Sequence, residues 1–176
     1  MALAGCPRVS FPAASIRIAP LGAEQDRAVF SCGKEPLDRY LREQATQDVR
    51  RGIAGVFVAV APARPERILG FFTLSAASVV PSELPRETAK HLPRHPIPAA
   101  LVGRLAVDRT VMRRGLGTIL LADAVQKAMT AAATVAMAVI VVDPIDDAAR
   151  SFYASFGFRS LEGPQSRMFL ALPRRK

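Results

Sequence analysis

The sequence predicts an α/β fold in one domain, with a mixed central sheet flanked by helices. Apolar runs with strand character alternate with segments of helical periodicity along most of the chain. The length of 176 residues fits a single domain, because one core stops growing only at about 250–300 residues. Apolar residues make up 50% of the chain, so it can bury a sizeable core and is not disordered as a whole.

The first part of the chain is predicted to supply a strand, a helix and a hairpin. Residues 1–15 lack periodicity, and we expect them to form a flexible arm. Pro36 stands where the first turn of a helix tolerates proline, and Gly70 indicates a bulge in the second hairpin strand. In chain order, we expect a strand at Ile16–Ala19, a helix from Leu37 to Gly52, and strands at Val56–Val60 and Ile68–Val80.

The second part begins with a long proline-rich connector, Pro81–Pro98, with at most short helices. Gly115 opens a helix whose apolar residues recur at helical spacing, and Gly157 ends a later helix. In chain order, we expect strands at Ala99–Val107, Val135–Val142, Phe158–Arg159 and Arg167–Leu172, with a helix at Asp146–Phe156 before the last two.

The composition is strongly basic, with 24 Lys and Arg against 15 Asp and Glu and a formal net charge of +9. This excess, which includes a basic tail at 173–176, favours polyanions or phosphorylated ligands as partners. Two cysteines do not make a disulfide framework, and prolines interrupt His91–His95, so we expect no metal. No apolar run approaches the roughly 20 residues of a membrane span, and we expect a cytoplasmic protein without a membrane partner.

The strongest local signal is a basic, glycine-containing loop between a predicted strand and a predicted helix, within Arg104–Thr118. A helix N-terminus exposes free N–H groups and the positive end of the helix dipole, and it therefore binds phosphate. Gly115 and Gly117 let the backbone approach an anion, and Arg113 and Arg114 add positive charge. The spacing excludes a Walker loop and falls short of a dinucleotide-binding GxGxxG loop. An ordinary strand-to-helix turn, with glycines for packing, is the alternative without a ligand.

Two motifs in this order resemble the GNAT (Gcn5-related) N-acetyltransferases. Met112–Gly117 is similar to the family's pyrophosphate loop, Gln/Arg-x-x-Gly-x-Gly/Ala, and Phe152–Phe158 is similar to a later segment of the family. Met112 departs from the pattern, since the family usually has Gln or Arg there. The resemblance covers about residues 16–172 and implies a GNAT-like fold with acetyl-CoA as co-substrate.

The resemblance also implies which residues bind acetyl-CoA. The backbone at the end of the strand would pair with the pantetheine arm, and amides of the loop and first helical turn would hold the pyrophosphate. Because backbone amides make most of these contacts, Met112 would cost one side-chain contact and leave the phosphate site in place. The implied residues are Leu105, Ala106 and Val107 on the strand, and Arg113, Arg114, Gly115, Leu116, Gly117 and Thr118 beyond it.

Acetyl transfer to an amine needs a proton donor for the leaving thiolate. A tyrosine, with an ordinary pKa of about 10, can donate to a thiolate whose conjugate acid has a pKa of about 8.5. Tyr153 stands where the sequence resembles the family's general acid, so we expect it to be catalytic; the alternative is a core tyrosine with a satisfied hydroxyl. Tyr40 follows an apolar helical stripe and is expected in the core. Asp146 is interpreted as a helix N-cap, and no residue stands out as a general base.

Further segments resemble the toxin branch of the family, which belongs to bacterial toxin–antitoxin pairs. They are Phe30–Leu41, Ile68–Ser75, Pro93–Pro98 and Gly103–Val107. That branch acetylates the α-amino group of aminoacyl-tRNA, blocks translation, and is neutralised by a small ribbon-helix-helix antitoxin. The resemblance thus implies aminoacyl-tRNA as substrate, such an antitoxin as partner, and a homodimer.

A tRNA substrate requires basic side chains for its phosphates, and its affinity should fall as salt rises. The proline-rich connector carries Arg86, Lys90 and Arg94, and we expect these three residues to bind nucleic acid. A solvated basic face without a ligand is the alternative. Two other functions stay open: a GNAT enzyme for a small amine or a protein N-terminus, and a module that binds nucleic acid or antitoxin without catalysis.

Overall fold

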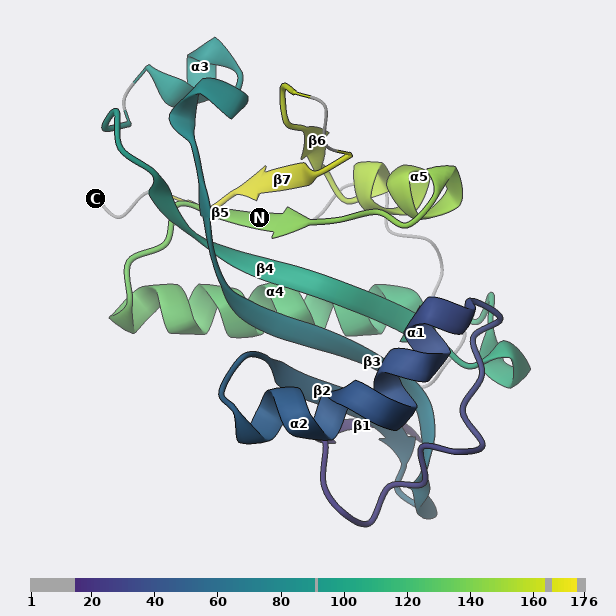
Figure 1. The fold of residues 1–176 in the computed structure, drawn as a ribbon. Coiled ribbons are helices and arrows are strands. Elements are labelled where there is room, and N and C mark those ends of the chain that lie inside the picture. The colour runs from purple at the N-terminus through teal and green to yellow at the C-terminus, as the bar shows by residue number, and fades with distance from the viewer. Residues whose placement is uncertain (1–14, 91, 164–165, 174–176) are drawn as a thin grey trace. The chain divides into compact units, whose positions relative to one another are not determined.

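The structure, a computed structural model, describes residues 15–90, 92–163 and 166–173 (Figure 1). Residues 1–14 of the expected arm and 174–176 of the expected tail lie outside the described residues. The described chain forms two compact units. The first unit contains residues 15–75 and Arg104–Ala124, and the second unit contains Ala76–Gly103 and residues 125–173.

Three antiparallel strands form the sheet of the first unit. In chain order they are β1 (Arg17–Pro20), β2 (Gly55–Ala61) and β3 (Arg64–Val79), and β2 pairs with both of the others. The register shifts after the pair Ala59–Gly70, which leaves Leu69 as the extra residue of a β-bulge. The bulge expected beside Gly70 is therefore confirmed.

The helical segment between β1 and β2 is not a regular α-helix. It consists of α1 (Glu35–Arg39), the π-helical turn η2 (Tyr40–Gln44) and α2 (Ala45–Arg50). In the π turn, the Ala45 N–H bonds to the Tyr40 carbonyl, one residue further back than in an α-helix. The location agrees with the helix expected at Leu37–Gly52, whose π turn the sequence pattern does not reveal.

Helices cover both faces of the first unit's sheet (Figure 1). On one face, the helical segment packs into a buried cluster that includes Tyr40 and Leu41. On the other face, α4 (Leu116–Thr134) lies against β3 at Gly70. A Cβ on Gly70 would lie 2.8 Å from Leu120 Cδ1 and 2.9 Å from the Ala106 carbonyl oxygen. Glycine therefore allows the close approach that positions the beginning of α4.

The second unit combines parallel and antiparallel pairing. Its elements are η3 (Pro81–Glu83), α3 (Arg86–Ala89), β4 (Ile97–Val107), β5 (Val139–Val142), α5 (Asp147–Ser155), β6 (Arg159–Ser160) and β7 (Met168–Ala171), with β4 continuing into the first unit. β5 is parallel to β4 and antiparallel to β7, which pairs with β6. A buried cluster that includes Ile97, Val139 and Phe169 forms its core.

The seven strands are hydrogen-bonded in the order β1-β2-β3-β4-β5-β7-β6, which confirms the expected α/β fold with a mixed sheet. The order of helices and strands along the chain also agrees with the sequence prediction.

One predicted strand is too long. The strand expected at Val135–Val142 begins only at Val139, because α4 continues to Thr134 through an alanine-rich, helix-favouring stretch. Val135 is 64% exposed, so its apolar side chain does not mark a buried strand. Within the described ranges, no helix has the length and apolar character needed to cross a membrane.

Candidate functional site

Asp108, directly after β4, fixes the start of the glycine-containing loop. Its side chain accepts hydrogen bonds from the Thr110 N–H at 3.0 Å, the Thr110 hydroxyl at 2.6 Å and the Ser31 N–H at 3.1 Å. It thereby caps the short 3-10 turn η4 (Arg109–Val111). Burial opposes ionisation, but these hydrogen bonds outweigh it and hold the pKa of Asp108 below its ordinary value. An ionised, buried carboxylate therefore sets the direction in which the loop leaves the strand.

The loop after η4 contains two residues with a left-handed backbone conformation. Arg113 has a φ of 59° and Gly115 a φ of 87°, both in the left-handed region. This conformation costs a non-glycine residue about 1–3 kcal/mol and is typical of ligand sites. Helix α4 begins directly after Gly115, so the N–H groups of its first turn have no helical partner. The segment from Arg113 to Thr118 thus presents a row of backbone donors, as the phosphate interpretation requires.

The strand residues expected beside the pantetheine lie beyond the ladder between β4 and β5. That parallel ladder ends at the pair Val102–Val142 and does not include Leu105–Val107. The side chain of Ala106 is buried in the core of the first unit. On the edge of β4 that the β5 ladder leaves out, the backbone of Leu105–Val107 can pair with an extended ligand arm.

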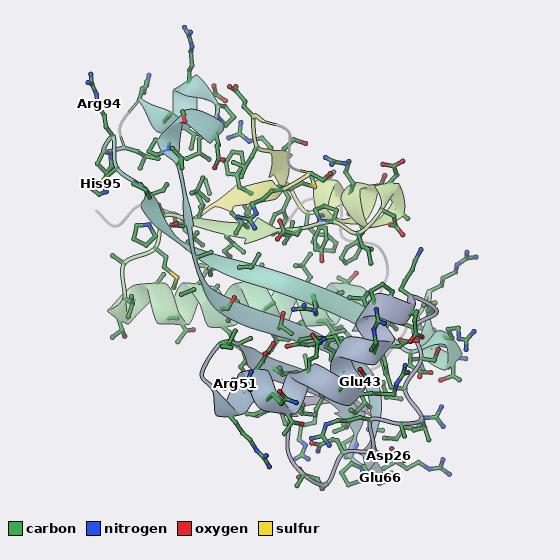
Figure 2. All side chains as sticks on the ribbon, in the orientation of Figure 1. Asp26, Glu43, Arg51, Glu66, Arg94 and His95 are labelled. Atoms are coloured by element: carbon green, nitrogen blue, oxygen red, sulfur yellow. The ribbon has the colours of Figure 1, made fainter. Side chains whose placement is uncertain are left out.

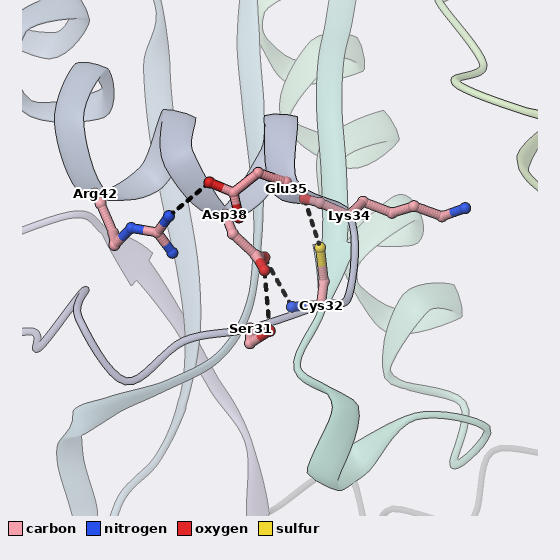
Figure 3. Close-up of polar contacts among 6 residues, drawn as sticks. All are labelled: Ser31, Cys32, Lys34, Glu35, Asp38 and Arg42. Atoms are coloured by element: carbon pink, nitrogen blue, oxygen red, sulfur yellow. Dashed lines mark hydrogen bonds and ion pairs between the residues drawn. The ribbon is translucent and has the colours of Figure 1, made fainter.

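A turn before α1 connects the helical segment to the loop (Figure 3). Asp38 accepts hydrogen bonds from the Ser31 hydroxyl at 2.9 Å and from the Cys32 N–H at 2.8 Å. The Ser31 carbonyl accepts from the Arg109 N–H at 2.9 Å, and the Ser31 N–H donates to Asp108. Ser31 therefore links α1 to the start of the loop through its side chain and both of its backbone groups.

Cys32 lies in the same turn but does not supply a nucleophile. Its thiol is buried and donates to the Lys34 carbonyl at 3.7 Å (Figure 3). Burial, together with the neighbouring Asp38, raises the pKa of the Cys32 thiol to about 11. A buried thiol with a raised pKa is predominantly protonated near neutral pH, which disfavours thiolate catalysis at this position.

Tyr40 is a core residue, as the sequence predicts, and a cation lies over its ring. Its hydroxyl donates to Asp48 at 3.0 Å, and burial together with Asp48 raises the pKa of Tyr40 to about 12. The guanidinium carbon of Arg104 lies 3.7 Å from the centroid of the Tyr40 ring. Arg104 directly precedes Leu105 on β4, so this pair adjoins the strand residues expected to bind the cofactor.

Tyr153 lies on α5 in the second unit with a buried ring. Its side chain is 6% exposed, and its ring centroid lies 5.4 Å from that of Phe152 and 5.6 Å from that of Phe158. Its hydroxyl forms no hydrogen bond with any described residue. Burial and the negative charge of Asp143 raise the pKa of Tyr153, so the hydroxyl stays protonated. Asp146 caps the same helix by accepting a first-turn N–H at 2.8 Å, as predicted.

The three connector cations expected to bind nucleic acid are exposed in the second unit. They are Arg86 on α3, Lys90 after it, and Arg94 before β4. Figure 2 shows Arg94 and His95 pointing outward from the connector. Arg159 forms an ion pair at 3.1 Å with Glu87, the acidic residue that directly follows Arg86 in the chain. None of the three cations has a hydrogen bond or ion pair with the part of the chain that the structure describes.

The structure brings the nine expected cofactor residues together in the first unit, and it places Tyr153 and the connector cations in the second. Sequence reasoning missed the bonds that join Ser31, Asp38 and Asp108, and the stacking of Arg104 on Tyr40. The resemblance covered the segments that hold Ser31, Asp38, Tyr40 and Arg104, but no sequence spacing indicates which of these residues, far apart in the chain, lie together in the structure. In the described residues, no group of three or more His, Cys, Asp or Glu could hold a metal ion.

Comparison with known proteins agrees with the loop and the fold. A model of the acetyltransferase (GNAT) family matches residues 30–158. A tRNA-acetylating toxin of Mycobacterium tuberculosis (strain ATCC 25618 / H37Rv) is 38% identical over 133 residues, which cover 76% of this chain and 78% of the relative.

Solved structures resemble this chain over nearly its whole length. AtaT complexed with acetyl-methionyl-tRNAfMet has a TM-score of 0.83 and 28% identity, covering 89% of this chain and 94% of that one. A mutant AtaT toxin bound to the C-terminus of the antitoxin AtaR and acetyl-CoA has a TM-score of 0.77 and 25% identity, covering 89% and 93%. By its loop, its fold and these similarities, the chain belongs to the acetyltransferase (GNAT) family.

Proposed function

We propose that this chain is an acetyl-CoA-dependent N-acetyltransferase toxin that acetylates the α-amino group of aminoacyl-tRNA. The observation that carries the proposal is the 38% identity to a tRNA-acetylating toxin over 76% of the chain. The similarity to AtaT complexed with acetyl-methionyl-tRNAfMet supports the same class of substrate. Acetylation removes the free amine of a charged tRNA, and the loss of that amine would block translation.

The loop and the first turn of α4 would hold the pyrophosphate of acetyl-CoA. The left-handed backbone at Arg113 and Gly115 and the row of donors up to Thr118 support this assignment. The edge of β4 at Leu105–Val107, which the pairing with β5 does not reach, would pair with the pantetheine arm. Met112, which replaces the family's usual Gln or Arg, is 41% exposed, and the proposed phosphate contacts come from backbone groups that do not depend on its side chain.

Tyr153 is the proposed general acid. In the transfer, the amine nitrogen bonds to the thioester carbonyl carbon, the C–S bond breaks, the amine releases a proton, and the thiolate takes one up. The Tyr153 hydroxyl is protonated at neutral pH and donates to no described residue, so its proton is available to the thiolate. An α-amino group with an ordinary pKa of about 7.7–8.0 is partly neutral at pH 7, which lessens the need for a general base.

The basic connector and an antitoxin complete the proposal. Arg86, Lys90 and Arg94 are exposed and unpaired in the described chain, and they would bind tRNA phosphates. A ribbon-helix-helix antitoxin would neutralise the enzyme, in line with the AtaT structure that contains the C-terminus of AtaR. The enzyme would act as a homodimer in the cytoplasm, where charged tRNA is used.

The test is incubation of the purified protein with labelled acetyl-CoA and a pool of aminoacylated tRNA, followed by identification of the labelled amino acid. We expect the label on the α-amino group of an amino acid esterified to tRNA, and none when the tRNA is deacylated beforehand. Transfer to small amines or to peptides with free N-termini, but not to charged tRNA, would favour the alternative acetyltransferase. Binding of tRNA without transfer to any acceptor would identify a binding module.

A further inference from the structure

The guanidinium of Arg104 is positioned by the fold but has no protein hydrogen bond. The guanidinium carbon lies over the Tyr40 ring, 3.7 Å from the ring centroid. The backbone N–H of Arg104 donates to the Thr73 hydroxyl oxygen at 3.0 Å. The guanidinium itself forms no hydrogen bond or ion pair with a residue in the described ranges. Its five N–H donors are therefore left for water or for a ligand.

The ring beneath Arg104 is a fixed platform. Tyr40 stacks on Phe71 with centroids 6.3 Å apart, and its hydroxyl is held by Asp48 at 3.0 Å. Tyr40 is also the first residue of the π turn η2, a type of turn that is frequent at functional sites. A guanidinium held over such a ring loses little freedom when it binds an anion, so the pair is organised in advance for a ligand.

The position of Arg104 on β4 separates it from the phosphate loop. Side chains alternate along a strand, so Arg104 and Ala106 share the face toward Tyr40, while Leu105 and Val107 share the opposite face. Arg104 lies about 10 Å before Val107 along the strand, at about 3.3 Å per residue. The pyrophosphate is assigned to the loop after Val107, and Arg104 is therefore at the thioester end of the strand, where the acceptor must arrive.

We infer that Arg104, held over Tyr40, binds a phosphodiester of the single-stranded 3′ end of the acceptor RNA. A planar guanidinium matches phosphate in a bidentate manner, and the net charge of +9 favours a polyanionic partner. The inference rests on the proposed function, because it assumes that the acceptor is an RNA. The inference adds to the predicted RNA contacts one residue, Arg104, that belongs neither to the connector cations nor to the cofactor loop.

The experiment measures the binding of two fluorescent RNA hairpins by anisotropy. One hairpin ends in single-stranded CCA, and the other is truncated to a blunt end. The variants are Arg104→Gln, Arg104→Lys and, as a matched control, Arg51→Gln, which removes the same charge from the end of the helical segment. Figure 2 shows Arg51 extending away from that segment.

Arg104→Gln is expected to weaken binding of the CCA hairpin by about 10- to 100-fold, the range for a hydrogen-bonded charge. It should lower the dependence of log K on log salt by about 0.7, which corresponds to one phosphate on a single strand. The Arg104→Gln variant should bind the blunt hairpin as tightly as the wild type does. Arg104→Lys should keep the salt dependence but lose part of the affinity, because an ammonium does not bind phosphate in a bidentate manner. Arg51→Gln should affect both hairpins equally.

Equal weakening on both hairpins, or no weakening on either, would overturn the inference. A KM for acetyl-CoA that rises as much as the KM for charged tRNA would also overturn it, because Arg104 would then serve the cofactor. Melting temperatures identify a folding defect, and Arg104→Lys keeps the test valid if Arg104→Gln is unstable. The proposed function fails on a separate result: the wild type would transfer no acetyl group to charged tRNA, regardless of its measured affinity for the hairpins.

Discussion

Tyr40 and Tyr153 are both buried tyrosines, yet only the hydroxyl of Tyr40 has a partner in the described chain. The Tyr40 hydroxyl bonds to Asp48, and the ring serves packing and the stacking of Arg104. Tyr153 places its ring among Phe152 and Phe158 and leaves its hydroxyl without a described partner. Among the described residues, the Tyr153 hydroxyl is not a fully buried polar group without a partner, so it is open to solvent or to a ligand, as a proton donor to a bound thiolate must be.

Tyr153→Phe should therefore separate activity from stability. We expect kcat to fall by about 10²- to 10⁴-fold, the usual contribution of a general acid. The free energy of unfolding should change by less than about 0.5 kcal/mol, because no described hydrogen bond is lost. Tyr40→Phe should instead cost about 0.5–1.5 kcal/mol through loss of the bond to Asp48. Steady-state kinetics and urea unfolding of both variants check this contrast; full activity of Tyr153→Phe would remove Tyr153 from the chemistry.

The pH dependence of the reaction follows from the protonation state that Tyr153 must hold. A proton donor works in its neutral form, and burial with Asp143 raises the pKa of Tyr153, so this form persists above pH 10. The acceptor amine must be neutral to attack, and its ordinary pKa is about 7.7–8.0. Initial rates should therefore rise to a plateau above about pH 8 and stay level to about pH 9.5. An alkaline fall within that range, absent from the residual activity of Tyr153→Phe, would contradict the assignment.

At the scale of elements, the sequence predicts most of the fold because each strand and helix has its own local pattern. The two departures, η2 and the start of β5, lie where that pattern is ambiguous. A π turn shifts the helical periodicity by one residue, and apolar residues at the end of an alanine-rich helix continue into a strand without a break. The position of the glycine-containing loop before α4 could be predicted because its glycines adjoin a helix start, while its binding of phosphate stays a prediction. The Arg104–Tyr40 pair depends on tertiary packing and has no local pattern.

The packing of α4 on β3 gives a prediction for Gly70→Ala. The new Cβ would lie 2.8 Å from Leu120 Cδ1 and 2.9 Å from the Ala106 carbonyl oxygen, so the Leu120 side chain must move and β3 must shift against the backbone of β4. We expect a loss of about 1–3 kcal/mol, as for other overpacked cores. Gly55→Ala is the matched control, since its nearest neighbour would be the side chain of Phe57 at 3.2 Å. Urea unfolding should show a clearly larger loss for Gly70→Ala; equal losses would mean that the packing around Gly70 on β4 and α4 does not require a glycine.

The basic side chains that give the molecule its net charge of +9 have different roles. Within the described ranges, ion pairs join Arg42 to Glu35, Arg159 to Glu87, and Arg167 to Asp143. Arg113 and Arg114 lie in the glycine-containing loop before α4, and the connector cations Arg86, Lys90 and Arg94 are exposed. If the charge served only general solubility, the position of a cation on the surface would not matter for RNA binding.

Reversing the charge at Arg86, Lys90 and Arg94 tests whether position matters. The triple Glu variant should weaken tRNA binding and lower the dependence of log K on log salt by about 2–3, since each phosphate contact contributes about 0.7–0.9. A matched triple variant at Arg39, Arg50 and Arg51 has the same net charge, and its effect should be smaller because it retains the connector contacts. The KM for acetyl-CoA should change in neither variant, because the cofactor loop is untouched. Equal salt dependence in the two variants would mean that tRNA responds to total charge and that the connector is not its binding surface.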